Sequence, residues 1–154
     1  MKKLTILIAG LMFTALAHTQ IYVDNDMEGL YFTADYSMYS GIHKEMYDNG
    51  NLRLEASLNN GVLDGETRLY FENGRLQEVR NYKSGRMNGL WETFNTEGVK
   101  TAQAFYKHGK KDGSWKIWND DGTLLYEMEY SNGQKTGTWR TFNNKGEVVD
   151  SIVY

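Results

Sequence analysis

Residues 109–132 read Gly-Lys-Lys-Asp-Gly-Ser-Trp-Lys-Ile-Trp-Asn-Asp-Asp-Gly-Thr-Leu-Leu-Tyr-Glu-Met-Glu-Tyr-Ser-Asn, and this stretch matches its neighbours when shifted by 24 residues either way. Three columns of glycine keep this step: Gly61, Gly85, Gly109 and Gly133; Gly41, Gly65, Gly89, Gly113 and Gly137; and Gly50, Gly74, Gly98, Gly122 and Gly146. Two aromatic columns keep it as well: Trp91, Trp115 and Trp139; and Tyr82, Tyr106, Tyr130 and Tyr154. A fixed period of this length indicates a repeat array.

Each unit is predicted to hold two short strands joined by a turn. Even positions from Leu124 to Tyr130 are apolar, whereas Glu127 and Glu129 fall on the other face, which is the period of two of a half-buried strand. The turns have the form Asn-x-x-Gly, in which the Asn side chain opens the turn and glycine takes a positive φ. First strands are expected at residues 66–71, 90–94, 114–118 and 138–142, and second strands at 76–82, 100–106, 124–130 and 148–154.

The links between units, such as Gly85–Gly89, are interpreted as five-residue connections of the form Gly-x-x-x-Gly. A parallel crossover needs a dozen residues or more, so each strand is expected to pair antiparallel with the next. The sequence therefore predicts an all-β fold, an elongated antiparallel meander of stacked β-hairpin repeats that forms a single-layer twisted strip. The five repeats are expected at residues 37–60, 61–84, 85–108, 109–132 and 133–154.

The first residues have the pattern of an export signal. Lys2 and Lys3 precede a mostly apolar run over residues 4–16, and residues 15–17 fit a small-x-small cleavage site. The run is shorter than the about 20 residues of a spanning helix. We expect a signal peptide over residues 1–19, cleaved after Ala17 or just before Gln20, and an exported protein in the periplasm, at the cell surface or outside the cell. Residues 20–36 are then a linker and a capping strand, Leu30–Phe32, that shields the first edge of the array.

Charge and cysteine content exclude several classes of site. The chain has 17 basic and 20 acidic residues, a formal net charge of −3, and no Lys/Arg-rich block, which argues against a nucleic-acid partner. The same acidity gives weak attraction to anionic membranes, so no more than peripheral contact is expected. Because there is no cysteine, disulfides, thiolate metal sites and a cysteine nucleophile are excluded.

Stability must come from packing between units, because a single hairpin is not stable in water. Trp91, Trp115 and Trp139 are predicted to be structural, as are the turn glycines Gly50, Gly74, Gly98, Gly122 and Gly146. Trp115 and Trp118 lie three residues apart. Either both faces of the strip carry an aromatic row, or a bulge rotates one of the two rings.

One aromatic row is the candidate binding face. Its members recur at constant pitch, with basic residues two positions before three of them: Tyr70, Phe94, Trp118 and Phe142, and Arg68, Lys116 and Arg140. If this row is open to solvent, it is an amphipathic platform for a protein, a peptide or a glycan. If the twist of the sheet covers it, the row is core.

No catalytic residue, metal ion or cofactor is expected. His43 occupies the tryptophan column and is interpreted as structural, and His108 falls in the turn before Gly109, far from His43 in the repeat. Acidic turns such as Asn119–Gly122 lack the spaced oxygens and closing bidentate Glu of a calcium loop.

Residues 113–124 follow the pattern Gly-x-Trp-x-x-aromatic-x-x-x-Gly-x-Leu and resemble the variant MORN repeat (membrane occupation and recognition nexus). The resemblance covers about residues 37–154 and departs at His43, Thr67 and Lys100. It implies a β-hairpin array with a role in recognition or scaffolding. Bacterial chains of this kind are also grouped with a YwqK-like antitoxin family, which fits poorly with an export signal.

The expected function is that of an exported, non-enzymatic module that binds or scaffolds another protein. The alternatives are an antitoxin or immunity-type inhibitor of a toxin, and binding to a glycan or lipid surface through the aromatic row. Residues 148–154 form an apolar strand at the end of the array, and unpaired edges recruit further strands, so edge-to-edge self-association is also expected there.

Overall fold

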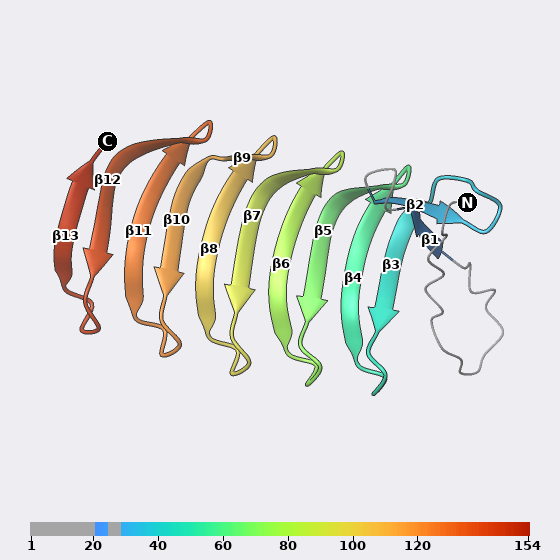
Figure 1. Ribbon diagram of the computed structural model, residues 1–154, viewed down its shortest axis with the longest axis horizontal. Helices are drawn as coiled ribbons and strands as arrows, with labels where there is room; N and C mark the ends of the chain where they lie inside the picture. The colour runs from blue at the N-terminus through green and yellow to red at the C-terminus, as the bar shows by residue number, and fades with distance from the viewer. Residues whose placement is uncertain (1–20, 25–28) are drawn as a thin grey trace.

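The computed structural model describes residues 21–24 and 29–154, and the expected export signal lies outside these described residues. The chain forms one open antiparallel sheet in which each strand lies beside the next along the sequence, together with a separate two-stranded ribbon (Figure 1). The predicted all-β meander of hairpins is therefore confirmed. Within the described ranges, no helix has the length and apolar character needed to cross a membrane.

The strands are β1 (Ile21–Asp24), β2 (Leu30–Thr33), β3 (Gly41–Met46), β4 (Leu52–Asn59), β5 (Val62–Tyr70), β6 (Leu76–Lys83), β7 (Arg86–Phe94), β8 (Lys100–Lys107), β9 (Lys110–Lys111), β10 (Gly113–Trp118), β11 (Leu124–Ser131), β12 (Gln134–Phe142) and β13 (Val148–Val153). The large sheet runs from β3 to β13 in chain order, and the short β9 pairs with β8 off this path. Each of the five expected 24-residue units thus contains one hairpin.

The Asn-x-x-Gly turns form as predicted, and they define one end of the sheet, here the turn end. In the turn between β7 and β8, the Gly98 N–H donates to the Asn95 carbonyl (2.9 Å) and the Asn95 N–H donates to the Val99 carbonyl (2.9 Å). The Asn95 Oδ1 atom also accepts from the Val99 N–H (2.9 Å). Gly98 has φ 87°, a conformation that L side chains rarely adopt. The turns at Asn119 and Asn143 repeat this pattern.

The opposite end, here the link end, differs from the prediction: a five-residue link between repeats is wrong. The connection between β6 and β7 is only Ser84-Gly85, with φ 48° and 76°, the two positive values of a type I′ turn. The strand β7 then begins at Arg86 and runs through Gly89. Arg80 pairs with Trp91 but Tyr82 pairs with Met87, so a bulge places Gly89 inside the strand. A sequence pattern does not distinguish such a bulge from a loop.

We expect Ser84→Asn to stabilise the protein by about 0.5–1 kcal/mol, because Asn-Gly is the favoured pair for a type I′ turn and Asn tolerates the left-handed conformation better than Ser. The midpoint of urea unfolding measures the change. Ser131→Asn, in the strand β11, is the control and should leave the midpoint unchanged. Equal midpoints for wild type and Ser84→Asn would contradict the turn assignment.

The two faces of the sheet have different chemistry. Trp91, Trp115 and Trp139 lie on one face, here the ladder face, because each pairs across the sheet with a residue of the same column: Trp91 with Ala104, Trp115 with Met128, and Trp139 with Ile152. Lys116 pairs with Glu127, and Glu127 with Arg140, on the other face, here the charge face.

The register also decides the orientation of Trp118. The strand β10 is regular from Trp115 to Ile117, so alternation places Trp118 on the charge face with Lys116. Ile117 pairs with Tyr126 and Trp118 with Leu124, so the extra residue is on β11. Both faces therefore carry aromatic side chains. The expectation that Leu124 shares a face with Tyr126 is wrong, because the bulge shifts Leu124 to the face of Trp118.

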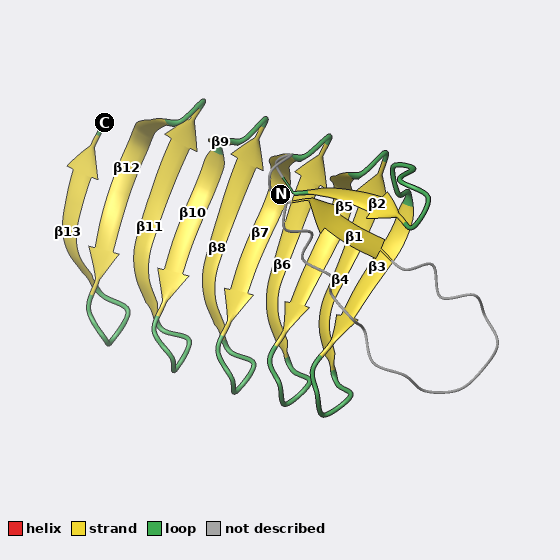
Figure 2. Ribbon diagram, turned by 45° about the vertical axis from the view of Figure 1, so that its right-hand side comes forward, coloured by secondary structure: helices red, strands yellow, loops and turns green. Residues whose placement is uncertain are grey.

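The N-terminal module, defined as residues 21–24 and 29–39, lies over the ladder face at the first repeats, where its ribbon crosses the strands (Figure 2). The Tyr31 N–H donates to the Gly61 carbonyl (2.9 Å), and the Tyr31 ring lies 5.3 Å from that of His43. The expected strand at Leu30–Phe32 is present as β2. However, it pairs with β1, which was not predicted, and β3 is the last strand of the large sheet. The expectation that this segment shields the first edge is wrong: it covers a face, where Tyr31 gains an aromatic neighbour.

The small core lies beneath this module. Of the described side chains, the most buried are those of Ala56, Leu58, Val79, His43 and Thr67, with exposed fractions of 9% or less. All except Val79 lie on the ladder face at the first repeats. Burial raises the pKa of the Tyr31 hydroxyl, and the nearby Glu45 carboxylate raises it further. Beyond the module, the sheet is one layer thick.

Candidate functional site

Six aromatic rings form a continuous row on the ladder face, here the Trp–Tyr ladder: Trp91, Tyr106, Trp115, Tyr130, Trp139 and Tyr154. Successive ring centroids lie 4.8–5.3 Å apart and the rings are tilted by 45–63° to one another, the range of favourable aromatic pairs. Tyr106 pairs across the strands with Gly89, which has no side chain to occupy the space beside the ring. The two aromatic columns seen in the sequence thus alternate to form one row.

Cationic side chains lie over these rings. The Lys111 Nζ atom is 4.1 Å from the centroid of Trp115 and 4.8 Å from that of Tyr130. Lys135 repeats this geometry, 4.4 Å from Trp139 and 4.7 Å from Tyr154. All four distances fall within the range of cation–π attraction. The lysines therefore cover part of the ring faces and add positive charge along the ladder.

The indole N–H groups hold the tryptophans in place. Trp115 Nε1 donates to the Phe105 carbonyl (3.2 Å) and Trp139 Nε1 to the Glu129 carbonyl (3.0 Å), each on a neighbouring strand of the sheet. Because these donors are satisfied within the sheet, the ladder presents a fixed apolar surface.

The ladder face is open toward its β13 end. Ile117, Tyr126 and Ile152 are 37%, 43% and 48% exposed, although all are large and apolar. Tyr126 and Ile152 line a shallow hollow together with Met128, Trp139, Arg140, Thr141, Asp150 and Tyr154. Contiguous exposed apolar surface of this kind is typical of an interaction site.

The structure brings the predicted row together on the other face. Tyr70, Phe94, Trp118 and Phe142 all lie half-buried at the turn end of the charge face, alternating with their partners Leu76, Lys100, Leu124 and Val148. Among the described residues no ring contact joins these four side chains, in contrast to the Trp–Tyr ladder. The row is neither buried core nor a continuous aromatic surface.

The predicted basic residues beside that row lie in ion pairs. Arg68 contacts Glu66 (2.6 Å), and Glu127 contacts both Lys116 (3.2 Å) and Arg140 (2.9 Å). These carboxylates neutralise the cations that an anionic ligand would require. A binding role for Arg68, Lys116 and Arg140 thus stays a prediction. Among the described residues, basic side chains without a carboxylate partner lie at other positions of the sheet, such as Lys111 and Lys135.

Glu127 gives a testable pH dependence. Its hydrogen bond from Lys116, assisted by Arg140 and opposed by burial, lowers the pKa of the Glu127 carboxyl below its ordinary 4.5. A lowered pKa contributes stability above the ordinary value, and this stability is lost as the pH falls through the folded pKa. We expect Glu127→Gln to lose about 0.2–1 kcal/mol at pH 7, since the pair is partly exposed, and to match wild type in acid. Urea unfolding at both pH values measures this, with Glu72→Gln at the turn end as control. A deficit that persists in acid would contradict the ion pair.

His43 and Thr67 occupy the tryptophan column of the first two repeats, and the structure explains both departures. They are buried beneath the N-terminal module, and an indole at either position would compete with it for space. The His43 Nε2 atom lies 3.2 Å from a Glu45 oxygen, and Glu45 also contacts Arg53. The hydrogen bond with His43 is the main cause of a lowered pKa at Glu45, against the opposing effect of burial. The replacement of tryptophan by His43 and Thr67 was the sequence signal that another segment covers the first two repeats.

The described residues contain no group of three or more His, Asp or Glu side chains placed to hold a metal ion. His108 lies in the link turn before Gly109, with φ 52°.

The family model described as MORN repeat variant matches residues 63–84 and 111–132. The two matched segments begin 48 residues apart, which is twice the period, and each contains a link-end strand, a turn and a second strand. These two segments are therefore similar to MORN repeats of the variant type, a non-catalytic kind of repeat that generally acts as a binding module. A search of curated proteins found no match.

Proposed function

We propose that this MORN-repeat chain is an exported, non-enzymatic module that binds another protein through the open part of its ladder face. The observation that carries the proposal is the Trp–Tyr ladder, a row of six rings in contact with one another on one side of a single-layer sheet. Aromatic side chains are enriched at protein interfaces, because they bury a large area at a small cost in conformational entropy.

The shape of the sheet supports the same function. The 11 strands of the large sheet present side chains of one column at regular intervals, and each repeat pairs with its neighbours along the sheet (Figure 1). Extended surfaces built in this way are used by repeat proteins for binding.

Site-specific photo-crosslinking in the producing cell tests the proposal. A photoreactive phenylalanine analogue replaces Tyr126, which is exposed on the ladder face, and in a second strain Lys145, which is exposed at the turn end. We expect discrete heavier bands that contain a second protein from position 126 and not from position 145. Equal labelling at both positions, or no band at either, would contradict a protein-binding ladder face.

The same experiment separates the antitoxin alternative. An antitoxin or immunity-type inhibitor predicts that the crosslinked protein is toxic when it is produced alone and harmless together with this chain. Export is tested on the same material, because cleavage after Ala17 or before Gln20 leaves a mature N-terminus that mass spectrometry identifies.

A further inference from the structure

We propose that the open part of the ladder face, from Trp91 to Tyr154, binds an extended acidic and aromatic segment of a partner protein, in the way that the N-terminal module binds the first repeats. This inference rests on the proposed function and adds the chemistry of the segment that is bound. Three features of the structure support it. They are the contacts of the module with the first repeats, the free carbonyls and the lysines at the equivalent positions of later repeats, and the distribution of charge between the two ends of the sheet.

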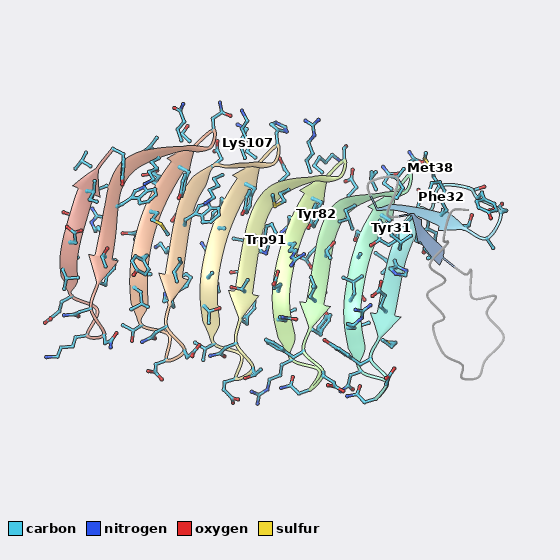
Figure 3. All side chains as sticks on the ribbon, viewed as in Figure 1. Tyr31, Phe32, Met38, Tyr82, Trp91 and Lys107 are labelled. Carbon is cyan, nitrogen blue, oxygen red and sulfur yellow. The ribbon has the colours of Figure 1, made fainter. Side chains whose placement is uncertain are left out.

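The module shows what this face accepts. Tyr31 places its ring against His43 of the tryptophan column and donates its N–H to the carbonyl of Gly61 in the first link turn. Figure 3 shows Tyr31 at the module, with Tyr82 and Trp91 on the sheet beyond it. The described residues of the module contain two acidic residues, Asp24 and Asp35, and no lysine or arginine. The segment that this chain places on its own ladder face is therefore both aromatic and acidic.

Later repeats have the same link-turn glycine, and within the described residues its carbonyl has no equivalent hydrogen bond there. The position equivalent to Gly61 is Gly109 in the fourth repeat and Gly133 in the fifth, and among the described residues no backbone N–H outside the strand ladders donates to either carbonyl. These carbonyls lie in the link turns at the link end of the sheet. A second extended segment can donate to them as Tyr31 donates to Gly61.

Lysine replaces an apolar residue at one position of the repeats that lie beyond the N-terminal module. The column next to the link turn reads Leu63, Met87, Lys111 and Lys135 in successive repeats. It is apolar in the second and third repeats, and it is lysine in the fourth and fifth repeats, which lie farthest from the module. Among the described residues no carboxylate lies within 4 Å of Lys111 or Lys135. The open part of the face thus offers unpaired positive charge directly over aromatic rings.

The two ends of the sheet carry opposite charge, although the net charge is small. The link end carries five basic residues without a carboxylate partner in the part of the chain that the structure describes: Arg86, Lys107, Lys110, Lys111 and Lys135. The turn end carries six acidic residues: Asp48, Glu72, Glu97, Asp120, Asp121 and Glu147. Figure 3 labels Lys107 at the link end. An acidic segment is therefore attracted to the link end of the ladder face and repelled from the turn end.

A peptide fits these features better than a glycan. Sugar rings stack on free aromatic faces, whereas Lys111 and Lys135 already cover faces of Trp115 and Trp139, and neighbouring rings contact the others at about 5 Å. A flat anionic membrane would meet the acidic turn end as well as the basic link end. A narrow chain that follows the link end avoids both difficulties.

The test is fluorescence anisotropy of a labelled peptide with the sequence of residues 21–39, added to the mature full-length protein. We expect saturable binding that weakens as salt is added, since exposed charges are screened. A peptide with Asn and Gln in place of its acidic residues, and one with Leu in place of its aromatic residues, should each bind about tenfold more weakly. No binding of the parent peptide, or equal binding of all three, would overturn the inference.

Matched protein variants locate the site. Lys111→Glu should weaken binding about tenfold, whereas Lys145→Glu, the same charge reversal at the turn end, should leave it unchanged. If Lys111→Glu lowers the melting temperature, Lys107→Glu, at an exposed link-end position, provides the second measurement. Equal effects of link-end and turn-end reversals would overturn the inference.

Other occupants give distinct results. Displacement of the peptide by vesicles of phosphatidylcholine and phosphatidylglycerol would overturn the inference in favour of a lipid surface. A dimer in sedimentation that Lys111→Glu dissociates would overturn it in favour of a second copy. If the crosslink at position 126 is found but the peptide does not bind, the face binds a protein of other chemistry, and only the further inference fails.

Discussion

Replacing Trp115 by alanine lowers the free energy of unfolding by about 3 kcal/mol, the largest loss we expect from a single side-chain truncation in this sheet. Trp115 lies between Tyr106 and Tyr130, with ring centroids 5.3 Å away on each side, and Lys111 covers it. Its removal interrupts the Trp–Tyr ladder between the third and fourth repeats. Because repeat arrays depend on interfaces between neighbours, the two halves then unfold less cooperatively.

Lys116→Ala is the matched control, since it changes the adjacent residue on the opposite face. Lys116 forms one ion pair with Glu127 and is partly exposed, so its loss should cost less than about 1 kcal/mol. Thermal unfolding followed by circular dichroism measures both variants. Equal melting temperatures would show that the ladder does not stabilise the array.

Replacing Gly89 by alanine destabilises the protein by about 2–3 kcal/mol, because two costs coincide there. Gly89 has φ 104°, which is unfavourable for any residue with a Cβ atom, and an added Cβ would lie 3.3 Å from the Asn81 Cβ atom. Asn81 is held in place by a hydrogen bond from its Nδ2 atom to the Leu90 carbonyl (2.8 Å), so it cannot readily move away.

Gly98→Ala separates the two costs. Gly98 also has a positive φ, 87°, but nothing lies within 4 Å of an added Cβ atom, so only the backbone penalty of about 1–2 kcal/mol applies. Urea unfolding compares the two variants. A loss at Gly98 as large as that at Gly89 would contradict the close packing of the bulge against β6.

The period and the turns made most of the fold predictable. The glycines that recur every 24 residues and the Asn-x-x-Gly segments determine the local backbone geometry, so the positions of the turns can be predicted from the sequence. The second strands agree with the predicted ones to within one residue, as at β11, where 124–130 became Leu124–Ser131, whereas first strands such as β7 begin four residues earlier than predicted. The bulge at Gly89 was not predictable in the same way, because glycine has the same preference for positive φ in a turn as in a bulged strand.

The candidate site was harder to predict, because it depends on which columns become neighbours. Trp115 and Tyr130 are fifteen positions apart in sequence and in contact only because β10 and β11 pair in this register. Neither the tryptophan column nor the tyrosine column shows by itself that the two kinds of ring alternate along one row of the folded sheet. The separation of charge was hidden for the same reason: the link-end lysines are spread over several repeats and come together only in the folded sheet.

Apart from the short β9, every strand of the large sheet pairs with the strands before and after it in the chain, and this has a consequence for how the molecule is made. No hairpin has to wait for a distant part of the chain, so ordering can advance from the first repeat as the polypeptide emerges from a ribosome or a pore. Chains rich in such local pairings reach their native state quickly for their size, and they leave few unpaired edges exposed to aggregation on the way. A sheet of this length without a second layer is thus accessible to a chain that has no disulfide to hold it.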